Sequence, residues 1–511
     1  MMNLFQSNLY AANSVLRVIN AVVKQCRANS VWATKRKPKT SADVALDYFD
    51  NIYSPIFGKQ WPSIRLALLS PHKYCAVVNN YGDNDSLCTQ LQNEGAINMR
   101  ELFESYQNVL SKKKRSSKKK KELKHVYALD KKLEKIVAKQ RDEELGKIYP
   151  EGAERLQPDY SSDKSSDINK GNLETEELIK QAKSPLEKSL SDANIDTNRQ
   201  IDPAEGLSSS KLNEFVPVSK LIGKENFVSE AEHFSFFNEA EDFPVTVEPE
   251  ESLHFPAHLQ VYTFDQGNIS TFTPSKSGTS GVLGYYLMDA GSVLPVLALG
   301  LRPGDTVLDM CAAPGGKSLL CLQTLYPDLV VCNDVSKSRL NRLSYIMQQY
   351  VTDWEQKVII TQEHGAGILG TDKYSKILVD VPCTTDRLSV MESDNNIFKP
   401  SRNKERILLP QLQVELLFQA LKLVKKGGAV VYSTCSLNPA QNDGVVQMAL
   451  RKVWEETSMK IVVKDLSPAL EPVKVVFKFA EPRCLKYGSL IVPYLPSNFG
   501  PMYFCKLEKE E

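Results

Sequence analysis

Several familiar signatures are missing from this chain of 511 residues. None of its ten cysteines forms a Cys-x-x-Cys pair, which argues against a zinc ribbon or a thioredoxin-type redox site. We therefore expect no metal site, and free thiols in a reducing compartment are the simpler interpretation. The chain also lacks any run of about 18 consecutive apolar residues, so we expect no membrane-spanning helix. The remaining signals come from charge segregation and from motifs at strand ends.

Acidic residues are absent from residues 1–42, which contain seven Lys or Arg. Apolar residues recur there at helical spacing between Val15 and Val23. This composition is typical of a mitochondrial transit peptide and predicts a protein of the mitochondrial matrix. A basic arm that contacts nucleic acid is the alternative. In either case we expect the folded protein to begin near Asp43.

The rest of the first half divides by composition. Residues 43–110 are dense in aromatic and aliphatic side chains, which predicts a small helical N-terminal domain. Residues 111–252 form a charged, low-complexity insert with the composition of a disordered segment. Within it, residues 112–121 contain eight basic residues in ten. This block is either a tether for RNA phosphates, whose affinity falls as salt rises, or a solvated insert without a specific role. The catalytic domain is then expected at 253–511.

The stretch Val307–Lys317, VLDMCAAPGGK, predicts a ligand-binding turn after a buried strand. Its small residues, Gly315 and Gly316 among them, let backbone N–H groups come close to a ligand. The helix expected after the turn has an N-terminus that attracts negative charge. An ordinary strand-to-helix turn could use the same residues. The sequence downstream is therefore needed to distinguish a ligand-binding turn from an ordinary one.

The sequence downstream of this turn predicts an α/β fold with a mostly parallel, doubly wound sheet. The strand at 329–333 ends at Asp334, seventeen positions beyond Lys317 (334 − 317 = 17). An acid at the end of the second strand of such a sheet can accept hydrogen bonds from a ribose. Further elements are expected as a helix at 284–301 and as strands at 261–264, 358–360, 377–379 and 430–432.

Two of these strands each deliver a cysteine to the same sheet edge, Cys383 after Asp380 and Cys435 after Thr434. Either cysteine alone could be a core residue, but the pair has a chemical use. C5 of cytosine is a poor nucleophile, so an enzyme that methylates it first adds a thiolate to C6. A helix N-terminus expected at Asn438 would favour the thiolate of Cys435. Asp380, if it is protonated or shares a proton, could hydrogen-bond the ring nitrogen or the exocyclic amine.

Four motifs together, CAAPGGK (311–317), DVSKSR (334–339), DVPC (380–383) and STCS (433–436), resemble the Sun/Fmu family of RNA cytosine-5 methyltransferases. Flanking segments at 45–79, 379–387, 395–406 and 497–507 are similar to its fourth Sun-domain paralogue, which acts on mitochondrial ribosomal RNA. The resemblance implies a Rossmann-like methyltransferase fold and S-adenosylmethionine as the methyl donor.

The resemblance also implies roles for individual residues. The expected cofactor-binding residues are Cys311, Gly315, Gly316, Lys317, Asp334, Arg339, His364, Gly365 and Asp380. The expected catalytic residues are Cys435, which attacks C6, Cys383, which assists product release, Asp380 and Lys317. One position departs from the family, because His364 stands where an Asp usually contacts the adenine amine. A neutral His can accept one hydrogen bond, so cofactor binding can survive there.

By the same resemblance, the partners are ribosomal RNA, a protein of the mitochondrial transcription termination factor family, and the large ribosomal subunit. Residues between the two cysteine motifs could flank the target base or form an exposed charged helix; they are Phe398, Lys399, Arg402, Lys404 and Arg406. The leading hypothesis is an enzyme that methylates a cytosine of mitochondrial small-subunit ribosomal RNA and has a role in mitoribosome assembly. The alternatives are an assembly factor with dispensable methylation and a transfer-RNA methyltransferase of the same fold.

Overall fold

The computed structural model describes residues 39–82, 84–109, 139, 243–481 and 485–510. The expected transit peptide, the basic block at 112–121 and most of the expected insert lie outside the described residues. Residues 39–109 and 243–510 belong to one compact unit. Their side chains share a core, since Phe49 and Tyr53 pack in the same cluster as Leu308 and Ile377.

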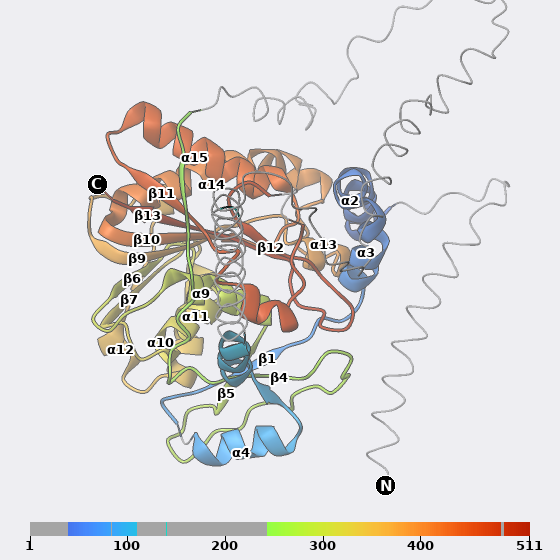
Figure 1. Cartoon of the computed structure of the whole chain (residues 1–511), viewed down its shortest axis with the longest axis vertical. Coiled ribbons are helices and arrows are strands. Elements are labelled where there is room, and N and C mark those ends of the chain that lie inside the picture. The colour runs from blue at the N-terminus through green and yellow to red at the C-terminus, as the bar shows by residue number, and fades with distance from the viewer. Residues whose placement is uncertain (1–38, 83, 110–138, 140–242, 482–484, 511) are drawn as a thin grey trace, which may run out of the picture. The chain divides into compact units, whose positions relative to one another are not determined.

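The core of this unit is a sheet of nine strands (Figure 1). In spatial order they are β3 (Thr246–Pro249), β11 (Ile461–Asp465), β13 (Met502–Lys509), β10 (Val424–Thr434), β9 (Tyr374–Asp380), β6 (Thr306–Asp309), β7 (Leu329–Asn333) and β8 (Val358–Thr361), with β12 (Ser489–Ile491) paired to β13. The run from β10 to β8 is parallel, and β13 joins it in the antiparallel direction. The chain moves outward from β6 to β8 and then returns to β9. The strand order therefore reverses between β6 and β9, where open α/β sheets bind ligands.

Helices cover both faces of this sheet, which explains why its central strands are almost continuously apolar. On one face lie α9 (Val293–Leu299), α10 (Gly316–Gln323) and α11 (Lys337–Tyr350). On the other lie α14 (Asn403–Leu423), α15 (Asp443–Glu456), α13 (Asp386–Met391), α2 (Ser41–Phe57) and α3 (Trp61–Leu69). Short elements complete this part: α12 (Trp354–Lys357), η1 (Gly58–Gln60), η3 (Ala290–Ser292), η4 (Gly365–Gly367), η5 (Pro400–Arg402), η6 (Pro439–Gln441) and η7 (Glu471–Val475). The expected Rossmann-like α/β fold is confirmed.

A second, smaller sheet corrects two sequence-based expectations. Its strands are β2 (Ile97–Asn98), β4 (Val261–Thr263), β1 (Cys75–Val78) and β5 (Tyr285–Met288), all antiparallel, with α4 (Asp85–Asn93) packed beside them. Residues 43–110 are therefore not purely helical. The helix expected at 284–301 is also wrong in its first part, because 285–288 pairs with β1 as a strand. Local composition allowed either state, and pairing with a distant strand decided it.

The end of the expected disordered insert is ordered, which is a further correction. Residues 246–249 form β3, which pairs in parallel with β11 at the edge of the main sheet. Ion pairs hold this edge, with Glu248 Oε2 2.7 Å from Lys464 Nζ and Glu250 Oε2 2.7 Å from the buried Lys506 Nζ. Within the ranges that the structure describes, we find no helix with the length and apolar character needed to cross a membrane.

Candidate active site

The glycine turn lies directly after β6, at the point where the strand order reverses. Gly315 has φ of +113°, a conformation that side chains rarely adopt, and it caps the N-terminus of α10. A Cβ on Gly316 would lie 3.3 Å from the ring of Tyr286, so the close approach leaves little room for a larger residue. Arg339 donates a hydrogen bond from its guanidinium to the carbonyl of Ala313. The turn is thus held from α11 and presents backbone N–H groups at a helix N-terminus.

Asp334 lies beside this turn, at the end of β7, with only 2% of its surface exposed. Its Oδ1 accepts a hydrogen bond from the backbone N–H of Ser336 at 2.9 Å. Arg339 Nη1 is 3.2 Å from Oδ2, but Oδ2 has no hydrogen-bond partner among the described residues. A buried carboxylate oxygen without a donor fits a ligand hydroxyl, as a ribose would supply.

Asp309, at the end of β6, is a second buried acid at this site and was not singled out from the sequence. Ser318 Oγ donates to its Oδ2 at 2.5 Å, and its Oδ1 has no partner in the described part of the chain. Burial raises the pKa of Asp309 to about 7, and the nearby Asp380 and Asp334 act in the same direction. Burial also raises the pKa of the neighbouring Cys311, so this side chain is a thiol at neutral pH.

His364 and Gly365 lie at the start of η4, beyond β8. A Cβ on Gly365 would meet Leu416 Cδ2 at 2.7 Å and Met310 Cγ at 2.8 Å, so only glycine fits against the residue after β6. His364 occupies the N-cap position of η4 without a side-chain hydrogen bond to it, and its side chain is exposed. The pair therefore lies next to the end of the central strand, with His364 accessible from solvent.

Lys317 and Asp380 form an ion pair between the first turn of α10 and the end of β9. The distance from Lys317 Nζ to Asp380 Oδ2 is 2.7 Å, and Ser433 Oγ donates to Asp380 Oδ1 at 2.7 Å. Burial alone would lower the pKa of Lys317. The negative charge of Asp380 and the hydrogen bond from Lys317 to Asp380 outweigh this effect, so the pKa of Lys317 is raised. The lysine is therefore a cation, and both oxygens of Asp380 act as acceptors.

The two cysteines meet, although they come from loops after different strands. Cys383 Sγ and Cys435 Sγ are 3.1 Å apart, with Cys383 buried and Cys435 half-buried. Asn438 caps η6 as expected, accepting from the N–H of Ala440 at 3.0 Å. The expected lowering of the Cys435 pKa is nevertheless wrong. The hydrogen bond with Cys383 and then burial raise that pKa well above its ordinary value, and Lys317 only opposes them. Cys435 is thus a thiol that needs a proton acceptor before it can react.

Asp386 holds the two cysteine loops together, and sequence reasoning missed it. Its carboxylate accepts from Thr384 Oγ1 at 2.5 Å, next to Cys383, and from Ser436 Oγ at 3.1 Å, next to Cys435. The N–H of Leu437 and the hydroxyl of Tyr53 on α2 donate to its other oxygen, both at 2.7 Å. The carboxylate is completely buried, and these four hydrogen bonds offset the free-energy cost of removing it from water. The spacing of the thiols therefore depends on α2 as well as on the sheet.

A cavity of about 660 Å³ opens beside Cys435. The residues that line it are Pro71, His72, Tyr74, Asp289, Ser292, Thr385, Arg387, Leu388, Met391, Glu392, Cys435, Gly500, Pro501 and Met502. Arg387 is buried in its wall and donates to the carbonyls of Gly500 at 2.8 Å and Ala67 at 2.9 Å. These bonds tie α13, α3 and the loop before β13 into one fixed wall.

The segment expected to flank the target base is arranged differently. Phe398 is only 2% exposed and packs against Tyr48 and Phe49 of α2, so it cannot stack on a base. The guanidinium of Arg406 lies 5.0 Å from the Phe398 ring centre, and Arg402 pairs with Glu405. The hypothesis that Phe398 flanks the target base is therefore wrong, because its ring belongs to the core.

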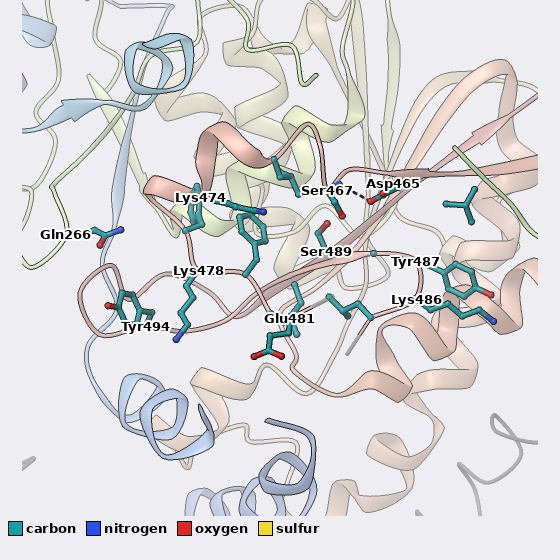
Figure 2. Close-up of a pocket in the computed structure, with 18 residues that line it drawn as sticks. Gln266, Asp465, Ser467, Lys474, Lys478, Glu481, Lys486, Tyr487, Ser489 and Tyr494 are labelled. Carbon is teal, nitrogen blue, oxygen red and sulfur yellow. Dashed lines mark hydrogen bonds between the residues drawn. The ribbon is translucent and has the colours of Figure 1, made fainter. Parts of the chain in front are cut away.

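A second cavity, of about 770 Å³, lies elsewhere on the main sheet (Figure 2). It is bounded by η7, by the segment that leads to β12, and by the loop after β12, which carries Tyr494. Lys474 and Lys478 line it together with Asp465 and Glu481, as the sticks of Figure 2 show. None of the residues expected at the active site lines this cavity, so its size alone does not make it the catalytic centre.

Comparison with known proteins gives consistent matches. The family model described as "16S rRNA methyltransferase RsmB/F" matches residues 296–479. The chain is 35% identical over 493 residues to "5-cytosine rRNA methyltransferase NSUN4" of Mus musculus, covering 96% of this chain and 94% of the mouse protein. It is 34% identical over 484 residues to "5-cytosine rRNA methyltransferase nsun-4" of Caenorhabditis elegans, covering 93% and 94%. A mouse "tRNA (cytosine(34)-C(5))-methyltransferase, mitochondrial" is 36% identical over 260 residues, covering 50% of this chain and 72% of its own length.

Proposed function

Because the chain belongs to the RsmB/F family of RNA (cytosine-5)-methyltransferases, which use S-adenosylmethionine, we propose that it methylates a cytosine of mitochondrial small-subunit ribosomal RNA through a covalent bond from Cys435 to C6. The observation that carries the proposal is the 3.1 Å contact between the sulfurs of Cys435 and Cys383 at the wall of a cavity. The ion pair of Lys317 with Asp380 lies on the cofactor side of the same centre.

The residues around the glycine turn fit the cofactor. Asp334 offers the ribose its buried Oδ2, which forms an ion pair with Arg339 but has no hydrogen-bond donor among the described residues. Gly315 and Gly316 would bring backbone N–H groups close to the ligand.

Gly365 keeps the adjoining turn tight against the residue after β6. Cys311 lies near Asp309 and Asp334, and His364 precedes Gly365 at the N-cap of η4. S-adenosylmethionine supplies the methyl group as a sulfonium and leaves as S-adenosylhomocysteine.

In the proposed reaction, Cys435 passes its proton to solvent in the open cavity beside it, and its sulfur bonds to C6 while the π electrons of the C5–C6 bond move onto C5. Asp380 accepts a hydrogen bond from the exocyclic amine of the cytosine, since its oxygens act as acceptors in the structure. Once C5 has gained the methyl group, its proton passes to solvent and the electron pair of that C–H bond re-forms the C5–C6 double bond. The bond between C6 and sulfur then breaks, and Cys435 leaves as a thiolate. Cys383 assists this release, since its own sulfur lies next to the bond that breaks.

The location and partners of the enzyme belong to the same proposal. The basic composition of residues 1–42 and the similarity to the mouse transfer-RNA enzyme named as mitochondrial support a mitochondrial location, and we propose the matrix. Ribosomal RNA is the proposed substrate. A protein of the mitochondrial transcription termination factor family and the large ribosomal subunit are the proposed partners, with a role in mitoribosome assembly. Transfer RNA is a second candidate substrate, favoured by the similarity to the mitochondrial transfer-RNA enzyme over half of this chain.

The test is methyl transfer from radiolabelled S-adenosylmethionine into separate transcripts of mitochondrial small-subunit rRNA, large-subunit rRNA and transfer RNA. We expect the wild type to label the small-subunit transcript and Cys435→Ala to label none. Cys88→Ala, at a half-buried cysteine outside the site, should match the wild type. If only transfer RNA is labelled, the substrate is transfer RNA, the second candidate, rather than ribosomal RNA. If no transcript is labelled even when a termination-factor-type partner is added, the proposed methylation is contradicted. The alternative, a role in assembly without methylation, would then remain.

A further inference from the structure

Three large apolar side chains are exposed at the mouth of the Cys435 cavity. Tyr74, Leu388 and Met391 are 45%, 51% and 48% exposed, and all three line the cavity that Cys435 lines. Single exposed apolar residues are ordinary on a protein surface, but a group of them around one cavity marks a binding surface. We call Tyr74, Leu388 and Met391 the apolar rim.

The rim is held rigidly, although its side chains face solvent. Leu388 and Met391 are three positions apart on α13 and so lie on the same side of that helix. The helix itself is fixed in place, because Asp386 and Arg387 are buried and form hydrogen bonds to the Cys435 loop and to the loop before β13. Tyr74 directly precedes β1, and its ring lies against the ring of His72, with centres 4.4 Å apart. A preformed surface of this kind binds a flat partner at low cost in conformational entropy.

The position of the rim indicates its occupant. A cytosine in a stacked helix cannot reach the Cys435 sulfur, so the target base must leave its stack and its neighbours lose a stacking partner. Aromatic and apolar side chains replace such stacking without regard to base identity. The rim is continuous with the wall that carries Cys435. Of the charged groups that line this cavity, Arg387 is buried, Asp289 is half-buried, and Glu392 is an exposed carboxylate that would repel a phosphate. The chemistry of the rim therefore suits a base rather than a phosphate.

We propose that the apolar rim stacks on the nucleotide adjacent to the target cytosine and so selects an unpaired, flexible segment of RNA as the substrate. This inference rests on the proposed function for the identity of the target base. It assigns a role to Tyr74, Leu388 and Met391, which form no part of the catalytic set.

The test uses a single-stranded 11-nucleotide RNA with one cytidine and with 2-aminopurine placed on its 5′ side or, in a second probe, on its 3′ side. The full chain should change the aminopurine emission of one probe on binding. Tyr74→Ala should weaken binding of that probe at least fivefold and remove most of the emission change, because stacking on an aromatic ring contributes about 1–3 kcal/mol per base. Tyr74→Phe should behave as the wild type. An abasic ribose in place of the aminopurine should weaken wild-type binding by a similar factor and leave Tyr74→Ala unchanged.

Matched controls come from exposed residues outside the cavity. Tyr106→Ala, at a tyrosine that is 41% exposed, and Leu408→Ser, at a leucine that is 52% exposed, should bind as the wild type, whereas Leu388→Ser should weaken binding. Equal binding and equal emission for Tyr74→Ala and wild type would overturn the proposal and leave the rim as a surface for a protein partner. If the wild type methylates RNA in that case, the proposed function still stands. If the wild type methylates no RNA but the probe responds through Tyr74, the proposed function fails and the rim remains an RNA-binding surface.

Discussion

The two sides of Cys435 are built differently. The cofactor side is made mostly from one continuous stretch, β6, the glycine turn, α10, β7 and the start of α11. The base side is assembled from the segment before β1, the loop before η3, α13, the Cys435 loop and the loop before β13. A site made from neighbouring residues depends on local turn geometry. A site made from distant segments depends on the buried groups that join them, which are Asp386 and Arg387. The two sides should therefore fail in different ways when they are mutated.

The largest effect on stability is expected on the base side, at Asp386. Asp386→Ala should lower the free energy of unfolding by about 3 kcal/mol, because Thr384, Ser436, Tyr53 and the N–H of Leu437 lose a buried acceptor. It should also reduce methyl transfer, since both cysteine loops lose their common anchor. Urea denaturation and a transfer assay measure the two effects, with the exposed Asp394→Ala as the control. If Asp386→Ala is as stable as the wild type, the base side does not depend on the hydrogen bonds to the Asp386 carboxylate.

On the cofactor side, Asp309 should make stability depend on pH. Its pKa is raised from 3.8 to about 7 on folding, so the folded state holds a proton that the unfolded chain has lost. The stability that this proton contributes is complete below pH 4 and is lost as pH rises towards 7, by about 2 kcal/mol between pH 5 and pH 7. In urea denaturation, Asp309→Asn should remove this decrease in the free energy of unfolding between pH 5 and pH 7. Asp328→Asn, at an exposed carboxyl, should not remove it. Parallel pH curves for Asp309→Asn and wild type would contradict the shift.

Asp334 separates cofactor binding from base binding. Asp334→Ala should weaken S-adenosylmethionine binding at least tenfold in calorimetry, since a buried charged acceptor for the ribose is lost. Binding of the aminopurine RNA should not change. Asp328→Ala, just before the other end of β7, is the matched control. An RNA-binding defect equal to the cofactor defect would show that the two sides are not separate.

The smallest effect is expected at His364. Its side chain is exposed at the N-cap of η4, a position that an aspartate occupies well. His364→Asp should bind S-adenosylmethionine at least as tightly as the wild type in calorimetry. Gln362→Asp, in the same loop, controls for the added charge. A clear loss of affinity in His364→Asp alone would mean that the imidazole has a role that an aspartate cannot fill.

The same contrast explains how much the sequence could predict. The turn at Gly315 and Gly316, Asp334 and the two cysteine loops were all predicted at the sheet edge, because each directly follows a strand of a recognisable parallel pattern. The closeness of the thiols to Lys317 and Asp380 follows from that topology. Asp386 and the rim residues Tyr74, Leu388 and Met391 were not predicted, since their roles exist only after α2, α13 and β1 have come together. For the same reason Phe398 was expected at the surface, and residues 285–288 were expected in a helix.

The most direct measurement of the central claim is trapping of the protein on RNA. Wild type, Cys383→Ala and Cys435→Ala would each be incubated with S-adenosylmethionine and small-subunit rRNA, and covalent adducts would be separated on a denaturing gel and mapped by mass spectrometry of the cysteine peptides. The two-thiol account predicts that Cys383→Ala accumulates an adduct linked through Cys435, because release is impaired, and that Cys435→Ala forms none and transfers no methyl group. An adduct linked through Cys383, or methyl transfer by Cys435→Ala, would contradict it.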